Sequence, residues 1–340
     1  MKDLFHKRVR PFEVTAKASV AQLVAGLEGT AFQARNLAQA TEIWGRMLED
    51  EVTIFLGLAG AMVPAGLRKV IVYLIENRLI DCLVSTGANL FHDVYETLGA
   101  LHWQHSPHTD DVELGEMRIN RFYDVLAPET EFSASEQFIG EFYRTLAPER
   151  AYTTREYCEL IGRALLPVAK EEGIITAAVK HGVPIYSPAL GDSAHGIAMT
   201  VARAKSGHRV YFDIIRDVLE TTHIATTAKG TGVIYLGGGT PKNFIQQAEV
   251  TSYAFGRELP GHRYGIQITM DVPEWGGLSG ATFEEAQSWR KIAPEASVVT
   301  VHVEASVALP IIVSALAESK AEAIKKRVRP VITFEGMRGA

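Results

Sequence analysis

A lysine beside a tryptophan, behind a glycine-rich loop, is the candidate nucleophile of this sequence. Residues 274–292 read EWGGLSGATFEEAQSWRKI and include Trp289, Arg290 and Lys291. A lysine amine that is partly removed from water loses its proton more easily, and the neutral amine attacks carbonyl and imine carbons. Taken alone, the residues fit a surface lysine next to a core tryptophan better. Chemistry at Lys291 therefore needs support from the rest of the chain.

The same stretch predicts a short helix that carries the reactive residues. Thr282 and Glu285 have the T-x-x-E spacing of a capping box, which predicts that the helix begins at Thr282. Glu285 and Trp289 are four residues apart and would share one face. Pro294 cannot continue a helix, so we expect it to end near Lys291.

Apolar runs, glycine-rich turns and helical patterns alternate along most of the chain. Runs without polar alternation are typical of strands that are covered on both faces. The order predicts an α/β fold with a doubly wound, largely parallel sheet and helices on both faces. We expect an N-terminal helical extension over residues 1–50 and a single domain over 51–340, with loops and two short helices between about 99 and 151. The predicted strands are 52–58, 79–84, 183–187, 232–236, 264–269 and 297–302.

Composition excludes several classes of partner. The chain has 340 residues, is 47% hydrophobic and carries a net charge of -6, which gives no general attraction to nucleic acids or anionic membranes. Two cysteines, no signal peptide and no apolar stretch long enough for a spanning helix favour a cytoplasmic location. We interpret the basic residues 325–329 as a solvated terminus.

The loops that follow the predicted strands favour a nucleotide. In a parallel sheet these loops meet at one edge, and their glycines let backbone N–H groups approach phosphates. No G-x-x-x-x-G-K-[ST] loop is present, which argues against a P-loop enzyme. His102, His105 and His108 have a spacing that could ligate zinc, but Pro107 interrupts any helix there, so we expect no metal site.

Six segments in order resemble those of the deoxyhypusine synthases. The resemblance extends over nearly the whole chain from Gly29 onwards. The segments are Thr53–Gly57 (TIFLG), Leu83–Gly87 (LVSTG), Tyr186–Asp192 (YSPALGD), Ile234–Gly239 (IYLGGG), Glu285–Ile292 (EAQSWRKI) and Glu304–Ser306 (EAS).

The resemblance implies a Rossmann-like NAD-binding catalytic domain and a lysine nucleophile. In this family NAD oxidises a polyamine carbon–nitrogen bond, and an active-site lysine captures the aminobutyl group as an imine before a second amine takes it. The family's lysine falls on Lys291. Trp289 would then be the apolar wall of the amine site, and Glu285 would hold a substrate ammonium. The family also implies a homotetramer with active sites at a dimer interface.

The family's NAD contacts fall on the predicted strand-end loops. Asp192 and Glu304 are the carboxylates that we expect on ribose hydroxyls. The implied cofactor-binding residues are Gly60, Ala61, Thr86, Gly87, Ala88, Asp192, Gly238, Asp271, Glu304 and Ala305.

Five positions depart from the eukaryotic pattern of this family. Acidic residues of the amine site correspond here to Ile197, Leu278, Phe91 and His92, and the histidine base corresponds to Asn243. A site with so few carboxylates would bind a tri-cation poorly. We therefore predict lysine chemistry on small-molecule amines, with a product such as homospermidine. In this interpretation Asn243, His92 and Leu278 line the amine site, and His92 or His195 takes over as base.

Two alternatives remain open. One is a true deoxyhypusine synthase that modifies a lysine of its translation factor, which would make a protein the substrate. The other is an NAD-binding regulatory or scaffold protein whose amine site has decayed.

Overall fold

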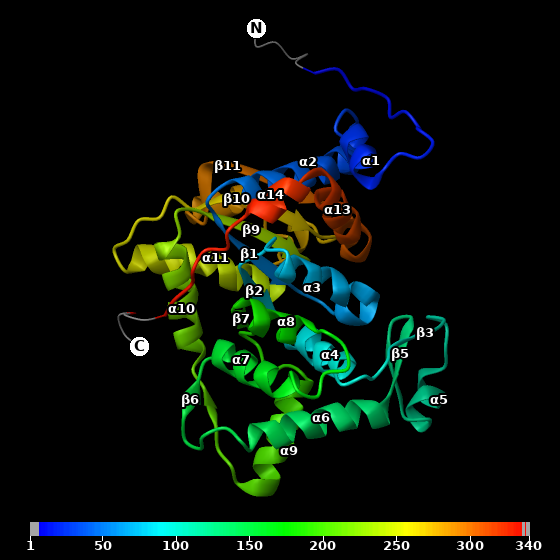
Figure 1. Ribbon diagram of the computed structural model, residues 1–340, viewed down its shortest axis with the longest axis vertical. Coiled ribbons are helices and arrows are strands. Elements are labelled where there is room, and N and C mark those ends of the chain that lie inside the picture. The colour runs from blue at the N-terminus through cyan, green and yellow to red at the C-terminus, as the bar shows by residue number, and fades with distance from the viewer. Residues whose placement is uncertain (1–6, 335–336, 338–340) are drawn as a thin grey trace.

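The computed structural model describes residues 7–334 and residue 337, and a six-stranded sheet lies at its centre (Figure 1). Every pairing in this sheet is parallel, which confirms the predicted α/β fold. The order is β11-β10-β9-β1-β2-β7, so the chain winds outward from β1 on one side and from β9 on the other. The strands are β1 (Thr53–Leu58), β2 (Cys82–Ser85), β7 (Ile185–Tyr186), β9 (Thr231–Leu236), β10 (His262–Ile268) and β11 (Ile292–Val301).

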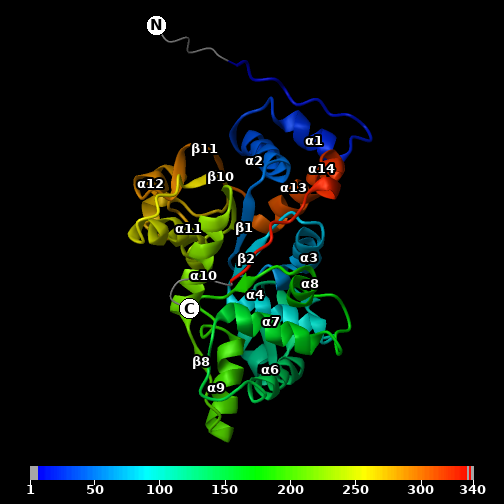
Figure 2. The same ribbon diagram turned by 60° about the vertical axis from the view of Figure 1, so that its left-hand side comes forward.

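Helices cover both faces of the sheet because the strands are apolar on both sides. On β1, Ile54 and Leu56 enter one core, whereas Phe55 between them enters the other. The first core includes residues of α2 (Phe32–Glu49), α3 (Arg68–Glu76) and α13 (Ala305–Ser319). The second includes residues of α10 (Ile214–Thr227), α11 (Gly239–Ala254) and α12 (Phe283–Ser288), and Figure 2 shows these helices on the opposite side of the sheet from α2 and α13.

The N-terminal helices pack against the end of the chain. Ser19 and Gln22 form a capping box that starts α1 (Val20–Leu27), and α1 lies against α13. The longer α2 carries the buried Trp44, whose indole N–H donates to the carbonyl of Leu79 at 3.2 Å. Within the segment 1–50 that was expected to be helical, the helices are α1 and α2, between Val20 and Glu49, and residues 7–18 are exposed.

The region between residues 99 and 151 is more regular than expected. Instead of loops and two short helices it holds an antiparallel sheet in the order β3-β5-β4, which projects beside α5 in Figure 1, and a 15-residue helix, α6. Its strands are only two to four residues long, too short for alternation to show in the sequence. The bounds are β3 (Trp103–Gln104), α5 (Asp111–Glu116), β4 (Ile119–Phe122), β5 (Val125–Pro128) and α6 (Glu129–Tyr143).

The remaining elements lie mostly in the lower half of Figure 1, where α6 packs on α9 and α7 on α8. A turn of π-helix, η1, leads into α3, and a short 3₁₀ turn, η2, precedes α12 in the chain. Their bounds are η1 (Val63–Leu67), α4 (Gly87–Thr97), β6 (Ala151–Tyr152), α7 (Thr154–Leu165), α8 (Ile174–His181), α9 (Ala194–Ser206), β8 (Tyr211–Phe212), η2 (Pro273–Trp275) and α14 (Ala321–Lys326).

The basic segment after α14 is not simply solvated, which corrects the expectation for residues 325–329. Arg327 is 7% exposed, and its two terminal nitrogens donate to the carboxylate of Asp81 at 2.9 and 2.7 Å. Arg329 donates to the carbonyl of His181 at 2.7 Å. The chain then runs past α7, where Phe334 lies under the guanidinium of Arg155. Arginines that satisfy buried acceptors act here as anchors for the C-terminal segment.

Candidate active site

Lys291 lies on the turn between α12 and β11, not on the predicted helix. Helix α12 ends at Ser288, three residues earlier than expected, and Trp289 is its C-cap. Arg290 adopts a φ of 59°, a left-handed conformation that reverses the chain. The helix ends earlier than expected because the chain reverses at Arg290, before Pro294 is reached. As a result, Trp289 and Lys291 point out of one tight turn.

The amino group of Lys291 is held between an amide and an aromatic ring. Its Nζ lies 3.4 Å from Oδ1 of Asn243, which is in the second turn of α11, and 5.4 Å from the centre of the Trp289 ring. Partial burial lowers the pKa of Lys291, and the nearby carboxylate of Glu285 opposes this shift. The structure thus brings together three residues that the sequence predicted for one site, and it lowers the pKa in the direction that a nucleophile requires.

Glu285 keeps its carboxylate for a partner other than its own helix. The hydroxyl of Thr282 accepts from the backbone N–H of Glu285 at 3.0 Å, as the predicted helix start requires. The side chain of Glu285 is exposed. Its negative charge opposes the lowering of the pKa of both Lys291 and Lys242. It is therefore positioned to attract a cationic amine.

The backbone of Lys291 is fixed on both sides. Its N–H donates to the carbonyl of Ala286 at 3.0 Å, and its own carbonyl accepts from the N–H of His262 at 3.0 Å. Next to it, Ile292 pairs with His262, and the register then jumps so that Ser297 pairs with Tyr264. The bulge between these pairs leaves Lys291 anchored at the amino end of β10.

A buried pair of ionisable side chains supports this anchor. Nδ1 of His262 lies 2.8 Å from the hydroxyl of Thr231 and 3.3 Å from Oε1 of Glu249. Burial lowers the pKa of His262 to about 3 and raises that of Glu249 to about 7. Both groups therefore favour their neutral forms inside the protein.

Replacing Glu249 by glutamine is expected to stabilise the protein more at high pH than at low pH. The folded pKa of about 7 exceeds the ordinary 4.5, so the folded state holds a proton that the unfolded chain has lost between these values. The contribution of Glu249 to the free energy of unfolding of the wild type is therefore lost as pH rises through 7. Glutamine does not titrate, so the variant does not show this loss. The free energy of unfolding is measured with urea at pH 5.5 and at pH 8 for both proteins. From pH 5.5 to pH 8, that of Glu249→Gln should rise by about 2 kcal/mol relative to that of the wild type.

The matched control for this prediction is Glu258→Gln, because Glu258 is 82% exposed in its side chain. Its difference from wild type should not change with pH. A pH-independent difference for Glu249→Gln would contradict the assignment of a buried, proton-holding carboxyl.

Lys242, a second lysine of the site, was not singled out by the sequence. It lies next to Asn243, is 2% exposed, and its Nζ donates to Oε1 of Gln267 at 2.8 Å and to the carbonyl of Ala281. Burial lowers its pKa to about 8. The only signal in the sequence is its spacing: Lys242, Ile245 and Glu249 fall on one face of α11, and all three are buried.

The predicted cofactor residues gather at the carboxyl edge of the sheet. Gly60 and Ala61 follow β1, Gly238 follows β9, and these two loops meet where the strand order reverses. The other loops join the same edge because all six strands are parallel. Thr86, Gly87 and Ala88 follow β2, Asp192 follows β7, Asp271 follows β10, and Glu304 with Ala305 follows β11.

Close contacts between glycines and neighbouring loops shape this edge. A Cβ on Gly87 would lie 2.4 Å from Oγ of Ser193, and one on Gly238 would lie 2.5 Å from Cα of Ser279. Asn89 binds the loop after β1 by accepting from the N–H of Met62 at 2.7 Å and donating to the carbonyl of Gly60 at 3.0 Å. Side chains larger than hydrogen would separate the loops.

The arrangement fits a dinucleotide. The strand order and its reversal between β1 and β9 are those of dinucleotide-binding sheets, in which the ligand crosses the reversal point. Helices α4 and α11 begin on Gly87 and Gly239 and direct backbone N–H groups toward this edge. Asp192 and Glu304 are exposed at its rim, where carboxylates can accept from ribose hydroxyls.

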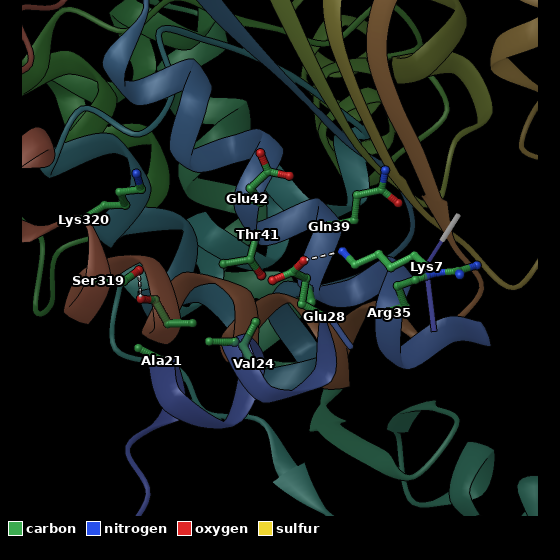
Figure 3. A pocket seen from close by; sticks show the side chains of 13 residues that line it. Lys7, Ala21, Val24, Glu28, Arg35, Gln39, Thr41, Glu42, Ser319 and Lys320 are labelled. Atoms are coloured by element: carbon green, nitrogen blue, oxygen red, sulfur yellow. Dashed lines mark hydrogen bonds and ion pairs between the residues drawn. The ribbon is translucent and has the colours of Figure 1, made fainter. Parts of the chain in front are cut away.

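A cavity of about 800 Å³ lies elsewhere, between α1, α2 and α13 (Figure 3). Lys7 and Glu28 form an ion pair of 2.8 Å at this cavity, and Arg35 and Glu42 also line it. It contains no residue of the predicted active site. Among residues 7–334 and 337, no three His, Cys, Asp or Glu side chains are grouped as metal ligands would be. Within the same residues, no helix has the length and apolar character needed to cross a membrane.

Comparison with known proteins decides the family. The model of the deoxyhypusine synthase family matches residues 22–316. The chain belongs to the deoxyhypusine synthase family. It is 48% identical over 323 residues to the probable deoxyhypusine synthase 2 of Methanosarcina mazei, which covers 94% of this chain and 92% of the relative. It is 49% identical over 289 residues to the probable deoxyhypusine synthase 2 of Archaeoglobus fulgidus, with 84% and 94% covered.

Solved structures agree on the fold. A putative deoxyhypusine synthase from Entamoeba histolytica superposes with a TM-score of 0.64 at 20% identity, over 90% of this chain and 96% of that one. The deoxyhypusine synthase family assignment supports an aminobutyl-transferase enzyme.

The positions that depart from the family pattern have two different environments. Ile197 and Leu278 are 57% and 49% exposed, so both apolar side chains face solvent. Phe91 and His92 are buried in an aromatic cluster, where Nδ1 of His92 lies 2.9 Å from Nε2 of His102. None of these four positions carries a carboxylate.

The two histidines considered as bases are both buried. Burial lowers the pKa of His92 to about 3 and that of His195 to about 4. Nδ1 of His195 lies 2.8 Å from the hydroxyl of Tyr157. Such low values make either imidazole a weak base near neutral pH.

Proposed function

We propose that this protein is an NAD-dependent transferase that moves an aminobutyl-type group from a polyamine donor to an acceptor amine through an imine on Lys291. The product that we propose is a small polyamine such as homospermidine. The observation that carries the proposal is the amine of Lys291, partly buried between Asn243 and Trp289. Asn243 lies about one helical turn from Gly239, where α11 begins at the dinucleotide edge.

Each residue has a role that follows from its chemistry. NAD, when bound, accepts a hydride from the donor carbon and later returns it. The neutral amine of Lys291 attacks the resulting imine carbon and expels the leaving amine, so that the four-carbon group stays on the lysine as an imine. Asn243 orients Nζ, and Trp289 packs on the methylene chain. Glu285 holds the terminal ammonium of the bound group.

The altered amine site favours a small acceptor. The exposed apolar Ile197 and Leu278 cannot pair with a tri-cation, and Asn243 cannot act as a base near neutral pH. Two paralogues of one organism are among the relatives. The chain is 48% identical to the probable deoxyhypusine synthase 2 of Methanosarcina mazei but 40% identical to its probable deoxyhypusine synthase 1.

A true deoxyhypusine synthase that modifies a translation-factor lysine is the second candidate. The names of the relatives favour it, since both archaeal paralogues are called probable deoxyhypusine synthases. In that case the acceptor lysine would enter the site on the surface of a protein instead of as a free diamine.

We further propose a homotetramer with the active site at a dimer interface, working in the cytoplasm. Trp289 is 61% exposed and Trp275 is 74% exposed, so the wall of the amine site is open to solvent in the single chain. A second copy would cover these rings and exclude water from the imine. Cys82 and Cys158 are free and buried, as a reducing compartment allows.

One reaction with two possible acceptors separates the candidates. The protein is incubated with NAD and spermidine, together with either putrescine or the translation factor of its host. We expect homospermidine and 1,3-diaminopropane by mass spectrometry in the first mixture and an unmodified factor lysine in the second. A modified factor without homospermidine would establish the second candidate instead. Failure of both acceptors would remove the transferase proposal.

A further inference from the structure

We propose that Gln267 is a positioning residue that joins the dinucleotide edge of the sheet to the loop in front of Lys291. This loop, residues 270–282, follows β10 and is called the amine loop below. It carries Trp275 and Leu278, which are 74% and 49% exposed. The inference rests on the proposed function, in which NAD binds at that edge and an amine binds beside Lys291. It assigns to Gln267 the coupling between these two binding sites.

The amide of Gln267 is buried and hydrogen-bonded through both its nitrogen and its oxygen. Gln267 lies on β10 and is 1% exposed. Its Nε2 donates to the carbonyls of Gly237 and Ser279 at 2.9 and 2.7 Å. Its Oε1 accepts from Nζ of Lys242 at 2.8 Å, and the same Nζ donates to the carbonyl of Ala281. One amide thus binds the turn after β9, the amine loop and helix α11.

The partners of this amide fix its orientation. If the amide were turned round, its oxygen would face two carbonyl oxygens and its NH₂ group would face the ammonium of Lys242. Only the observed orientation is therefore favourable. A side chain at position 267 has to donate two hydrogen bonds and accept one. Glutamine does both, whereas an ionised glutamate of the same shape only accepts.

The amine loop and the turn after β9 also touch directly. The N–H of Gly239 donates to Oγ of Ser279 at 3.0 Å, and a Cβ on Gly238 would lie 2.5 Å from Cα of Ser279. Further along the loop, a Cβ on Gly280 would clash with the carbonyl oxygen of Val272. No side chain fits between these segments, so a movement of the turn after β9 is passed on to Ser279.

The contacts of Gln267 reach the amine site from two sides. Ser279 follows Leu278, so the fixed part of the amine loop begins where its exposed part ends. Lys242 precedes Asn243, whose Oδ1 lies 3.4 Å from Nζ of Lys291. A dinucleotide that orders the turn after β9 therefore also orders the loop and the helix turn that face Lys291. By linkage, an amine bound there strengthens binding of the dinucleotide by the same factor.

Hydrogen exchange followed by mass spectrometry tests this coupling without turnover and without NAD. Gln267→Glu keeps an acceptor for Lys242 but removes both donors, so the two segments lose their common partner. We expect the peptides that cover 237–243 and 270–282 to exchange roughly ten-fold faster in this variant, the effect of losing two buried hydrogen bonds. Peptides of β1 and β2 should exchange as in the wild type. Faster exchange throughout the sheet would show a purely structural role and overturn the proposal.

Gln287→Glu is the matched control. Nε2 of Gln287 also donates to two backbone carbonyls, those of Ala293 and Pro294 at 3.1 and 3.4 Å, but both belong to the start of β11. Its replacement should leave exchange of 237–243 unchanged. Wild-type exchange in Gln267→Glu, or an equal effect of the two glutamate variants on 237–243, would overturn the proposal.

A second variant covers the case in which Gln267→Glu does not fold. Ser279→Ala removes the Oγ that accepts from the N–H of Gly239 and leaves the buried amide intact. Exchange should then rise roughly three-fold in both 237–243 and 270–282, since one partly buried hydrogen bond is lost. A rise confined to 270–282 would show that the two segments move independently and would overturn the proposal.

Addition of NAD separates this inference from the proposed function. In the wild type, NAD should slow exchange of 270–282 as well as that of the loop after β2, whereas in Gln267→Glu it should protect only the latter. Protection of 270–282 without aminobutyl transfer would keep this inference and remove the proposed function. Transfer together with wild-type protection in Gln267→Glu would keep the function and overturn the inference. If NAD protected no loop of the wild type, both would be overturned.

Discussion

Lys291→Arg should form no borohydride-stable adduct and should lose aminobutyl transfer by a factor of about 10³ or more. Arginine keeps the positive charge and much of the length, but its guanidinium stays protonated and cannot form an imine. In the wild-type protein, treatment with NAD and spermidine followed by borohydride should place a four-carbon adduct on the peptide that contains Lys291. The thermal midpoint of the variant should remain close to that of the wild type, since Nζ of Lys291 has a single weak contact of 3.4 Å with Asn243.

The control for this prediction is Lys229→Arg. Lys229 is 71% exposed and pairs with Glu51 on the surface, so its replacement should change neither adduct nor rate. An adduct that persists in Lys291→Arg would contradict the assignment. If mass spectrometry located it on Lys242, the nucleophile would be the more deeply buried of the two lysines.

Arg327→Met is expected to lower the free energy of unfolding by about 3–5 kcal/mol, because it leaves the carboxylate of Asp81 buried without its main partner. The pair is bidentate, at 2.9 and 2.7 Å, and Asp81 is fully buried. Arg327 also donates to the carbonyl of Val52 at 3.1 Å, and Asp81 accepts from the N–H of Ile54 at 2.8 Å. Chemical unfolding of the two proteins at pH 7.5 measures the difference.

Lys326→Met is the matched control, one residue earlier. Lys326 is 78% exposed and lies 4.0 Å from Glu322, an ion pair that contributes little to stability. Its replacement should leave stability almost unchanged. Addition of Asp81→Asn to Arg327→Met should recover part of the loss, since the uncompensated charge is then removed. A loss below 1 kcal/mol for Arg327→Met would show that water reaches Asp81.

The sheet could be predicted because its strands differ sharply from their surroundings. The apolar run of β1 is buried in two different cores, and the loop that follows it contains Gly60 and Gly66. The antiparallel β3-β5-β4 sheet could not be predicted, since its strands are short and none of its residues except Ala127 is fully buried. Arg327 was misjudged for a related reason. A basic residue near a terminus is normally solvated, and only tertiary structure places Asp81 beneath it.

At the active site the sequence located the side chains but not their support. The roles of Lys291, Trp289 and Glu285 were predicted by resemblance. The structure places Trp289, Glu285 and Asn243 near the amine of Lys291. The contacts that hold them come from elements far along the chain, such as His262 on β10 and Lys242 on α11. Periodicity cannot reveal such contacts, because a buried lysine and an exposed one have the same pattern unless the burial of the helix face is known.

The two backbone hydrogen bonds of Lys291 limit how the group it carries can travel. With its N–H bound to Ala286 and its carbonyl bound to His262, the residue cannot slide along the turn. Only its four-carbon stem can swing. The backbone of Lys291 therefore stays fixed while its side chain moves. Donor and acceptor must both present their nitrogen within the reach of this one side chain. The length of the side chain therefore limits where substrates can bind. Any acceptor, whether a free diamine or a protein lysine, has to bring its amine within that distance.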